Sequence, residues 1–317
     1  MKILLPEQNV LSRGDISLKF FEEFGETKVL ENPNRETLEK EIVDTDVLFV
    51  NKINVDKALL EKAEKLKYIG ECATGFNNID LKACKAKGVT VTNVPSYSTM
   101  AVAQHTWALI LEHFSRIGEY NRFVQQDGWI NSPVFSPFIY GTEELAGKTL
   151  GLIGCGKIGK QVGKIGNAFG VKVLAFTRTK DSGIENDIEY CTLDRCLQES
   201  DIISIHCPLT ETTENLINYK TIEKMKDGAF IVNTARGPIV NEKDLANALK
   251  AGKLSGAGLD VIDMEPMKKD CPLIGIENCI ITPHVAWAPK ETRERLLDIV
   301  KKNYVSFLKG ETENRIV

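Results

Sequence analysis

The chain has 317 residues, 43% of them hydrophobic and 26% charged, which is an ordinary globular composition with room for two domains. Its formal net charge of −4 gives no general attraction to nucleic acid or to an anionic membrane surface. No apolar run approaches the roughly 18 residues of a membrane span. The N-terminal "MKILLPEQ" reaches a proline too early for a secretory signal, so we expect a cytoplasmic protein.

Eight cysteines are present, and none of them forms a CxxC motif. Cys191 and Cys196 are the closest pair, but no histidine lies nearby to complete a zinc site. Cys72, Cys155 and Cys207 lie in or beside apolar runs, where a free cysteine behaves as a small hydrophobic residue. We therefore predict reduced thiols, as in a reducing cytoplasm, and no metal site.

The first hundred residues alternate short apolar runs with amphipathic segments, which predicts a parallel sheet with helices on its faces. The expected strands are 2–5, 47–50, 67–73 and 89–91, with helices at 56–65 and 80–86. From Thr99 to about Ile117 the sequence is apolar on so many sides that this helix must be buried, with a second subunit as one candidate partner. The aromatic loop 128–141 that follows, "GWINSPVFSPFIYG", could shape a pocket or serve plain packing.

A second α/β series begins near residue 149 and predicts a doubly wound dinucleotide-binding fold. Its six expected strands are 149–153, 171–176, 201–206, 228–233, 256–261 and 279–282. The final helix, about 290–308, has one apolar face.

The segment "GLIGCGKIG" places Gly154, Gly156 and Gly159 directly after an apolar strand and before an amphipathic helix. In this context GxGxxG allows a tight turn, close approach of a pyrophosphate and close helix packing, with the phosphates at the helix N-terminus. The alternative is a glycine-rich connector without a ligand. We predict that this loop, together with Lys157 and Ile158, holds a dinucleotide.

The end of the next strand lacks the acidic residue that usually holds the adenine ribose. Thr177, Arg178 and Thr179 stand there instead, which removes a repulsive charge and offers a cation and two hydroxyls to a 2′-phosphate. We therefore predict that NADP(H) is preferred, with NAD(H) as the alternative. In the competing interpretation Arg178 is only a solvated charge, and Asp181 or Glu185 reaches the ribose.

Arg236, Glu265 and His284 follow later strands, where ligands bind in such sheets. Singly, they could be a surface ion pair, a turn residue and a core histidine. Together they suit a 2-keto acid. An arginine fork holds the carboxylate and polarises the carbonyl, histidine delivers a proton, and glutamate keeps the imidazole protonated.

Three segments resemble the D-isomer-specific 2-hydroxyacid dehydrogenase family, and the resemblance extends over essentially the whole chain. They are "GFNNIDLKACKAKGVTVTNVPSYSTMAVAQHT", "HCPLTETTENLIN" and "NTARGPIVNEKDLANALKAGKLSGAGLDVIDMEP…NCIITPHVAW". The segments "PHVAWAPKETRERL" and "NKINVD" look most like the glycerate dehydrogenase/hydroxypyruvate reductase branch.

The resemblance implies roles for individual residues. Arg236 would bind the substrate carboxylate and carbonyl, His284 would be the acid/base, and Glu265 would support it. Backbone amides around Thr74, Gly75 and Phe76 would hold the substrate carboxylate. The remaining cofactor contacts would be Cys207, Pro208, Thr234, Ala235, Asp260 and His284.

The resemblance also implies an architecture of two doubly wound parallel-sheet domains, a Rossmann-type cofactor domain inserted into a flavodoxin-like substrate domain. The substrate domain would comprise 1–98 and 287–317, and the cofactor domain 99–286. Family members are usually homodimers, with the helix after residue 98 in the interface.

The expected function is reversible NAD(P)H-dependent reduction of a small 2-keto acid, hydroxypyruvate or glyoxylate, to the D-2-hydroxy acid. One alternative is a dehydrogenase for another 2-hydroxy acid, of the D-3-phosphoglycerate, D-lactate or 2-ketogluconate type. The other is a non-catalytic, dinucleotide-sensing protein that resembles the corepressors on this fold. A formate dehydrogenase would leave the His–Glu pair unexplained. No nucleic acid or membrane partner is expected.

Overall fold

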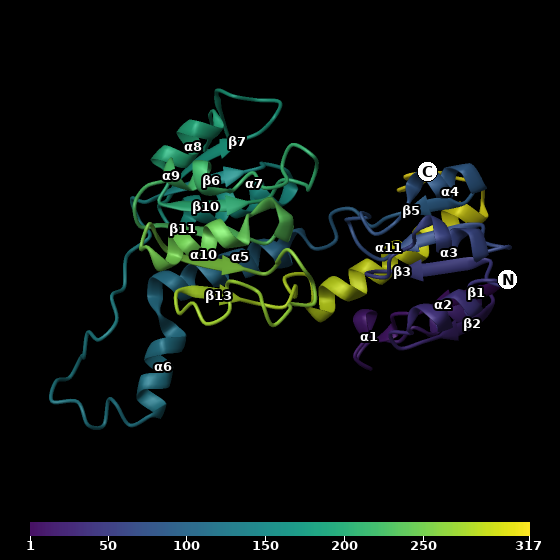
Figure 1. Ribbon diagram of the computed structural model, residues 1–317, viewed down its shortest axis with the longest axis horizontal. Coiled ribbons are helices and arrows are strands. Elements are labelled where there is room, and N and C mark those ends of the chain that lie inside the picture. Colours follow the sequence, from purple (N-terminus) through teal and green to yellow (C-terminus); the bar gives the residue numbers. More distant parts are fainter. The chain divides into compact units, whose positions relative to one another are not determined.

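A computed structural model describes residues 1–317, which divide into two compact units (Figure 1). The first unit is Met1–Ser98 with Ala288–Val317, and the second is Thr99–Trp287. Trp287 thus falls in the second unit, although the sequence analysis assigned it to the first. Each unit is built around its own sheet.

The first unit contains a five-stranded parallel sheet in the order β2-β1-β3-β4-β5. This is the flavodoxin-like 2-1-3-4-5 order, so the predicted fold is confirmed. The strands are β1 (Lys2–Leu5), β2 (Glu26–Val29), β3 (Val47–Val50), β4 (Tyr68–Glu71) and β5 (Thr90–Thr92). The helices are α1 (Gln8–Leu11), η1 (Lys19–Glu23), α2 (Arg35–Glu41), α3 (Lys57–Lys62), α4 (Leu81–Lys87) and α11 (Lys290–Leu308).

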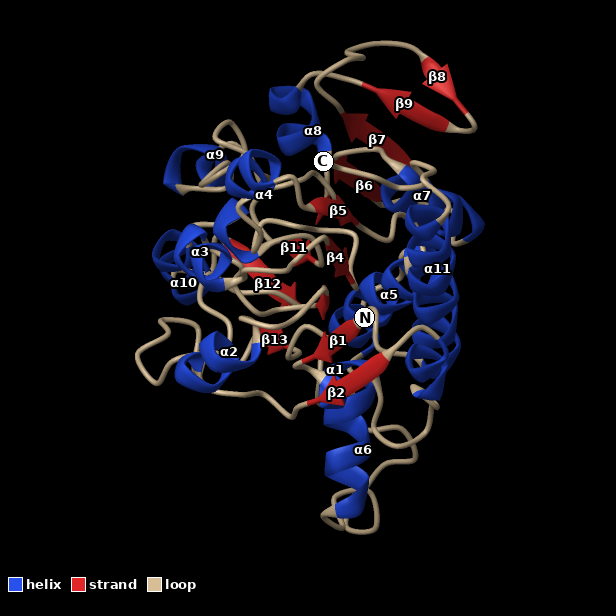
Figure 2. Cartoon of the chain, turned by 90° about the vertical axis from the view of Figure 1, so that its right-hand side faces the viewer, coloured by secondary structure: helices blue, strands red, loops and turns tan.

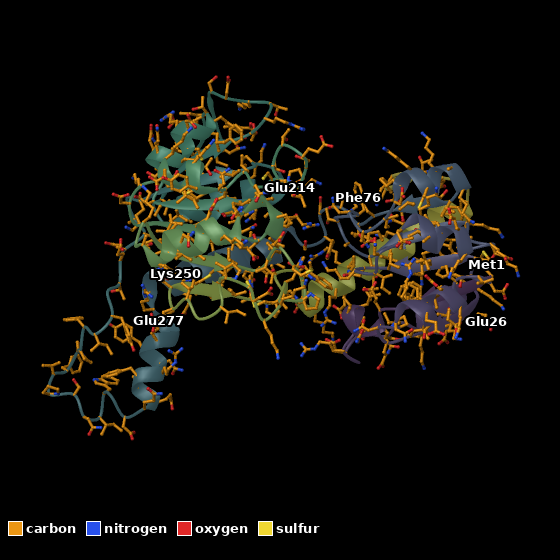
Figure 3. The ribbon with its side chains drawn as sticks, in the orientation of Figure 1. Met1, Glu26, Phe76, Glu214, Lys250 and Glu277 are labelled. Carbon is orange, nitrogen blue, oxygen red and sulfur yellow. The ribbon has the colours of Figure 1, made fainter.

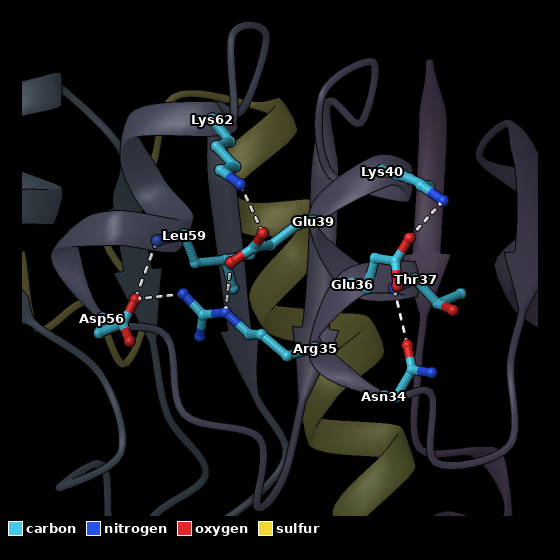
Figure 4. A network of polar contacts seen from close by, with 9 residues as sticks. All are labelled: Asn34, Arg35, Glu36, Thr37, Glu39, Lys40, Asp56, Leu59 and Lys62. Carbon is cyan, nitrogen blue, oxygen red and sulfur yellow. Dashed lines mark hydrogen bonds and ion pairs between the residues drawn. The ribbon is translucent and has the colours of Figure 1, made fainter.

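Side-chain caps begin the two neighbouring helices α2 and α3 (Figure 4). The Asn34 side chain accepts from Thr37 N at 2.9 Å, and Asp56 Oδ1 accepts from Leu59 N at 2.8 Å. Arg35 on α2 also donates to Asp56 Oδ1 at 2.7 Å, which joins the two helix starts. These caps satisfy amide groups that have no partner within the helix.

The second unit contains an eight-stranded sheet in the order β13-β12-β11-β10-β6-β7-β9-β8. Counted from β6, the parallel strands follow the Rossmann order 3-2-1-4-5-6, extended by β13. An antiparallel hairpin of β8 and β9 lies beside β7, with β8 as the edge strand (Figure 2).

The strands of the second unit are β6 (Thr149–Ile153), β7 (Lys172–Phe176), β8 (Ile184–Glu185), β9 (Ile188–Tyr190), β10 (Ile202–Ile205), β11 (Ala229–Asn233), β12 (Leu254–Leu259) and β13 (Cys279–Ile281). Its helices are α5 (Thr99–Ser115), α6 (Ile117–Gln125), α7 (Lys157–Ala168), α8 (Leu193–Glu199), α9 (Tyr219–Glu223), η2 (Gly237–Ile239) and α10 (Glu242–Lys250).

Helix α5 is buried within its own unit, where it packs against α7, β11 and β12. Trp107 of α5 donates its indole N–H to Val162 O of α7 at 3.0 Å. Two glycines permit this close packing. A Cβ on Gly163 would lie 3.2 Å from Leu152, and one on Gly166 would lie 3.2 Å from Trp107. Much of the apolar surface of α5 is therefore buried within its own unit, although Met100 is 58% exposed.

Helix α6 and residues 126–144, which we call the arm, project from the second unit (Figures 1 and 2). Helix α6 buries no residue, and apolar side chains of the loop stand open to solvent (Figure 3). Ile130, Phe135 and Phe138 are 80%, 88% and 91% exposed. These side chains of the aromatic loop therefore do not pack into the core of the unit.

All eight cysteines are free thiols, in agreement with the sequence prediction. No helix combines the length and apolar character needed to cross a membrane. No group of three or more histidine, cysteine, aspartate or glutamate side chains is placed to hold a metal ion.

Candidate active site

The glycine loop between β6 and α7 has the geometry that a dinucleotide pyrophosphate requires. Gly154 has a positive φ of 94°, and a Cβ there would meet Cys207 N at 2.5 Å. A Cβ on Gly159 would meet Gly154 O at 2.4 Å, whereas Gly156 has nothing within 4 Å of that position. Two glycines are thus needed for backbone packing, and the third leaves an open face toward a ligand.

The start of α7 supplies donors for that ligand. Gly156 is the N-cap residue and has no side chain to cap the helix. The amide groups of Lys157 and Ile158, the first two helical residues, have no partner within the helix. With the positive end of the helix dipole, these groups suit a phosphate, so the predicted cofactor loop fits the group that it should hold.

Residues 177–180 form a tight turn at the end of β7. Thr177 Oγ1 donates to Lys180 O at 3.1 Å, and Lys180 N donates to Thr177 Oγ1 at 3.2 Å. The hydroxyl of Thr177 therefore closes the turn. Arg178 and Thr179 have exposed side chains, and no protein group holds either of them.

Two lysines beside this turn bind one glutamate. Glu185 of β8 accepts from Lys160 at 2.8 Å and from Lys180 at 3.2 Å, and these bonds lower the pKa of its carboxyl. Lys180 Nζ also lies 4.0 Å from the centroid of the Tyr190 ring. Arg178 and Lys180 of the turn, with Lys160 beside it, supply three cations against two acids, Glu185 and the adjacent Asp181, so the local charge stays positive.

The other expected cofactor residues lie at the carboxyl ends of β10 and β11. Cys207 and Pro208 follow β10, and burial raises the pKa of the Cys207 thiol to about 11. Thr234 and Ala235 follow β11, where Thr234 Oγ1 lies 3.0 Å from Thr106 Oγ1 of α5. These residues lie at the same carboxyl end of the sheet as the glycine loop. Cys207 is next to that loop, since a Cβ on Gly154 would meet Cys207 N at 2.5 Å.

Arg236 follows β11 on a backbone fixed by a buried asparagine. Asn233 Oδ1 accepts from Ala235 N at 2.9 Å, and its Nδ2 donates to Arg236 O at 2.9 Å. The guanidinium makes a single hydrogen bond, to Ala235 O at 2.7 Å, and no carboxylate pairs with it. The surface ion pair considered for Arg236 is therefore wrong, and its fork remains available for a planar anion.

Glu265 and His284 form the pair that the sequence predicted. His284 Nδ1 lies 2.6 Å from Glu265 Oε2, while Glu265 Oε1 accepts from Ile262 N at 3.2 Å. Because Nδ1 donates to the carboxylate, Nε2 is left for a substrate. The Arg236 loop lies against this segment, since a Cβ on Gly237 would fall 1.8 Å from Ile262 O.

His284 has a left-handed backbone, with φ of 54°, which costs a residue with a Cβ on the order of 1–3 kcal/mol. Asp260 accepts the hydrogen bonds that hold the backbone at and after His284. Its backbone oxygen accepts from His284 N at 2.8 Å, and its carboxylate accepts from Val285 N and Ala286 N at 2.9 Å each. Asp260 is 1% exposed, so its carboxylate is fully engaged within the protein.

In the first unit, Thr74, Gly75 and Phe76 follow β4, and Figure 3 marks Phe76 on this loop. Thr74 Oγ1 donates to Val94 O at 2.8 Å, and Asn93 Nδ2 donates to Thr74 O at 2.7 Å. The amide groups of residues 74–76 donate to no protein acceptor. Three consecutive amides on a fixed loop can receive a carboxylate.

Sequence reasoning missed three supporting residues, Asn233, His105 and Thr282. Asn233 ends a predicted strand next to Arg236, and a polar residue in "FIVNTARG" was a signal that could have identified it. His105 Nε2 lies 2.9 Å from Thr282 Oγ1, although the two residues are 177 positions apart in the sequence. No local sequence pattern predicts such a contact.

Residues 107–286 match the sequence profile described as D-isomer specific 2-hydroxyacid dehydrogenase, NAD binding domain. The chain is 42% identical over 318 residues to a hydroxypyruvate reductase of Blautia hydrogenotrophica, covering 99% of both chains. Two solved structures share 32% identity. The D-lactate dehydrogenase of Aquifex aeolicus complexed with NAD and lactic acid has a TM-score of 0.87 and covers 100% of this chain and 99% of its own. An acyclic imino acid reductase in complex with NADPH and D-Arg has a TM-score of 0.88 and covers 100% of both chains.

Proposed function

Because the chain belongs to the D-isomer-specific 2-hydroxyacid dehydrogenase family, we propose that it reduces hydroxypyruvate to D-glycerate or glyoxylate to glycolate. As a family member it is an oxidoreductase that acts on CH–OH donors and uses a nicotinamide dinucleotide. The observation that carries the proposal is the contact of 2.6 Å between His284 Nδ1 and Glu265 Oε2. The same unit contains Arg236, whose guanidinium has no acidic partner.

Each side chain has one task in this proposal. The Arg236 fork grips the substrate carboxylate and polarises the adjacent carbonyl. His284 Nε2 gives a proton to the carbonyl oxygen, and Glu265 stabilises the imidazolium before the transfer. The glycine loop would hold the pyrophosphate of a nicotinamide dinucleotide, and that cofactor would supply the hydride when bound.

The substrate is tested with a panel of keto acids, which should include hydroxypyruvate, glyoxylate and pyruvate. We expect the highest kcat/KM for hydroxypyruvate or glyoxylate. The kcat/KM for pyruvate should be lower than that for hydroxypyruvate. A protein group that hydrogen-bonds to the C3 hydroxyl of hydroxypyruvate would have no partner when pyruvate binds. Equal kcat/KM values for pyruvate and hydroxypyruvate would exclude this specificity. Chiral analysis of the glycerate formed from hydroxypyruvate should give the D isomer.

NADPH is the preferred reductant in this proposal. The 177–180 turn carries no acid, Arg178 is unengaged, and Lys160 and Lys180 add positive charge nearby. Asp181 and Glu185 were considered as alternative ribose ligands. The two oxygens of Glu185 accept from Lys160 and Lys180, which leaves Asp181, directly after the turn, as the alternative. A 2′-phosphate would gain from the surplus of cations, whereas an unphosphorylated ribose would not.

A second copy of the chain is the partner we propose for the arm. Exposed phenylalanine and isoleucine side chains gathered on one projecting segment are typical of a surface that another chain covers. Light scattering should give twice the chain mass, and Phe135→Asp with Phe138→Asp should yield monomers. A monomeric unmodified protein would contradict the proposal.

A further inference from the structure

We propose that His105 and Thr282 are positioning residues that act through Asp260 to hold His284 in its working conformation. This inference rests on the proposed role of His284 as the acid/base. It starts from the left-handed backbone at His284, which the surrounding structure has to maintain.

The hydrogen bonds around Asp260 explain how that backbone is maintained. Asp260 Oδ1 accepts from Thr282 Oγ1 at 2.6 Å and from Val285 N at 2.9 Å, while Oδ2 accepts from Ala286 N at 2.9 Å. The peptide groups on the C-terminal side of His284 are thus bound by one carboxylate. The orientation of that carboxylate sets the orientation of the turn that carries the imidazole.

His105 completes the network from helix α5. Its Nε2 lies 2.9 Å from Thr282 Oγ1 and 3.4 Å from Asp260 Oδ1. Thr282 has one hydroxyl proton, which it gives to Asp260, so its oxygen accepts from His105 and Nε2 carries a hydrogen. Thr282 therefore donates to Oδ1 and is itself held by His105 of α5.

The charge of Asp260 is maintained by the same contacts. Burial raises the pKa of this carboxyl, but the hydrogen bonds from His105, Thr282 and the backbone amides outweigh burial and lower the pKa below its ordinary value. A carboxylate with every oxygen occupied by protein donors is a rigid anchor. Helix α5 is well suited to carry one donor, because it is itself packed against α7 and the sheet.

Thr282→Val is the most direct test, because it removes one hydroxyl with little change in volume. We expect kcat for keto-acid reduction to fall about ten- to a hundredfold, the scale on which a hydrogen bond to a charged group matters. The dissociation constant of the nicotinamide cofactor, measured by calorimetry, should change far less than kcat. Thr282→Ser should restore kcat, and His105→Phe should lower it in the same way.

Thr92→Val is the matched control. Thr92 is also buried, and its hydroxyl lies 2.6 Å from Tyr68 Oη in the first unit. This variant should keep its kcat. If it loses as much activity as Thr282→Val, the effect is general loosening and the proposal is wrong.

A double variant separates this inference from the proposed function. If Thr282 acts through His284, adding Thr282→Val to His284→Ala should cause no further loss of kcat. Additive losses, an unchanged kcat in Thr282→Val, or a loss that Ser does not rescue would overturn the positioning role. Full activity in His284→Ala alone would instead overturn the proposed function.

Discussion

The turns at 282–286 and 177–180 follow two strands of the same sheet, and they are built in opposite ways. In the first, the amides of residues 284–286 are all bound by the buried Asp260. In the second, Thr177 closes the turn by itself and leaves Arg178 and Thr179 exposed. In the proposed function, the turn that carries the acid/base is therefore fixed by the protein, whereas the turn that selects the cofactor is left for the ligand to engage. Changes in the first turn should alter kcat, and changes in the second should alter KM for the cofactor.

His284→Ala should produce the largest effect. Loss of a general acid lowers kcat by about 10²-fold or more. The measurement is steady-state reduction of the preferred keto acid, with cofactor affinity measured separately. If cofactor affinity falls and kcat does not, the contrast between the two turns is lost.

Arg236→Lys keeps the positive charge and loses the two-pronged fork. We expect kcat/KM for the keto acid to fall about tenfold to a hundredfold, because two parallel charge-assisted bonds become one. Initial rates over a range of keto-acid concentrations give this ratio. Near-normal activity in the lysine variant would mean that Arg236 does not grip a carboxylate.

Substitutions in the 177–180 turn should change cofactor choice and leave the chemistry intact. Arg178→Ala should raise KM for NADPH about tenfold with little effect on NADH, since one ion pair to the 2′-phosphate is lost. Thr177→Asp should move preference toward NADH, because its charge repels the phosphate. An equal loss with both cofactors in Arg178→Ala would show that this side chain does not meet the phosphate.

Glu265→Gln tests the support of the acid/base. The glutamine cannot stabilise the imidazolium at Nδ1, so the alkaline limb of the kcat profile for reduction should move toward acid. The profile is measured from pH 5 to 9 with saturating substrates. An identical profile would remove Glu265 from the mechanism.

His113 of α5 contrasts with His284. It is buried in the core, and its Nε2 lies 3.0 Å from the hydroxyl oxygen of Ser255. Burial, with a smaller contribution from Arg116, lowers the pKa of His113 from 6.5 to about 4. Between these values the unfolded chain binds a proton that the folded protein does not, so acidification destabilises the fold. Between pH 7 and pH 5, the unfolding free energy of the unmodified protein should fall. The fall in the His113→Gln variant should be smaller by about 2 kcal/mol. Parallel losses measured by urea unfolding would contradict this.

The sequence predicted most strands because buried parallel strands are continuous apolar runs, as in "VLFV" and "FIVN". It missed β2, whose residues are largely exposed, and the β8–β9 hairpin, whose turn uses Asn186 and Asp187 at positive φ. Neither segment has the apolar periodicity on which the prediction relied. Gly163 and Gly166 had no explanation from sequence, since their packing against Leu152 and Trp107 is a tertiary contact.

The site was predictable to the extent that chemistry depends on residue type. Arg236, Glu265 and His284 were predicted because each follows a strand and each suits one part of keto-acid reduction, and the structure pairs Glu265 with His284. The residues that hold them could not be identified in the same way. His105 and Thr282 meet only through the fold, and a histidine within an apolar helix has no distinguishing local pattern.

The most direct test of the whole account is the ratio of kcat/KM with NADPH to that with NADH, measured on the unmodified protein with hydroxypyruvate as substrate. The assay requires both turns, because turnover depends on the His284 turn and the ratio depends on the 177–180 turn. We predict efficient turnover and a ratio well above one. Equal or better kcat/KM with NADH, or no turnover with either cofactor, would contradict the account.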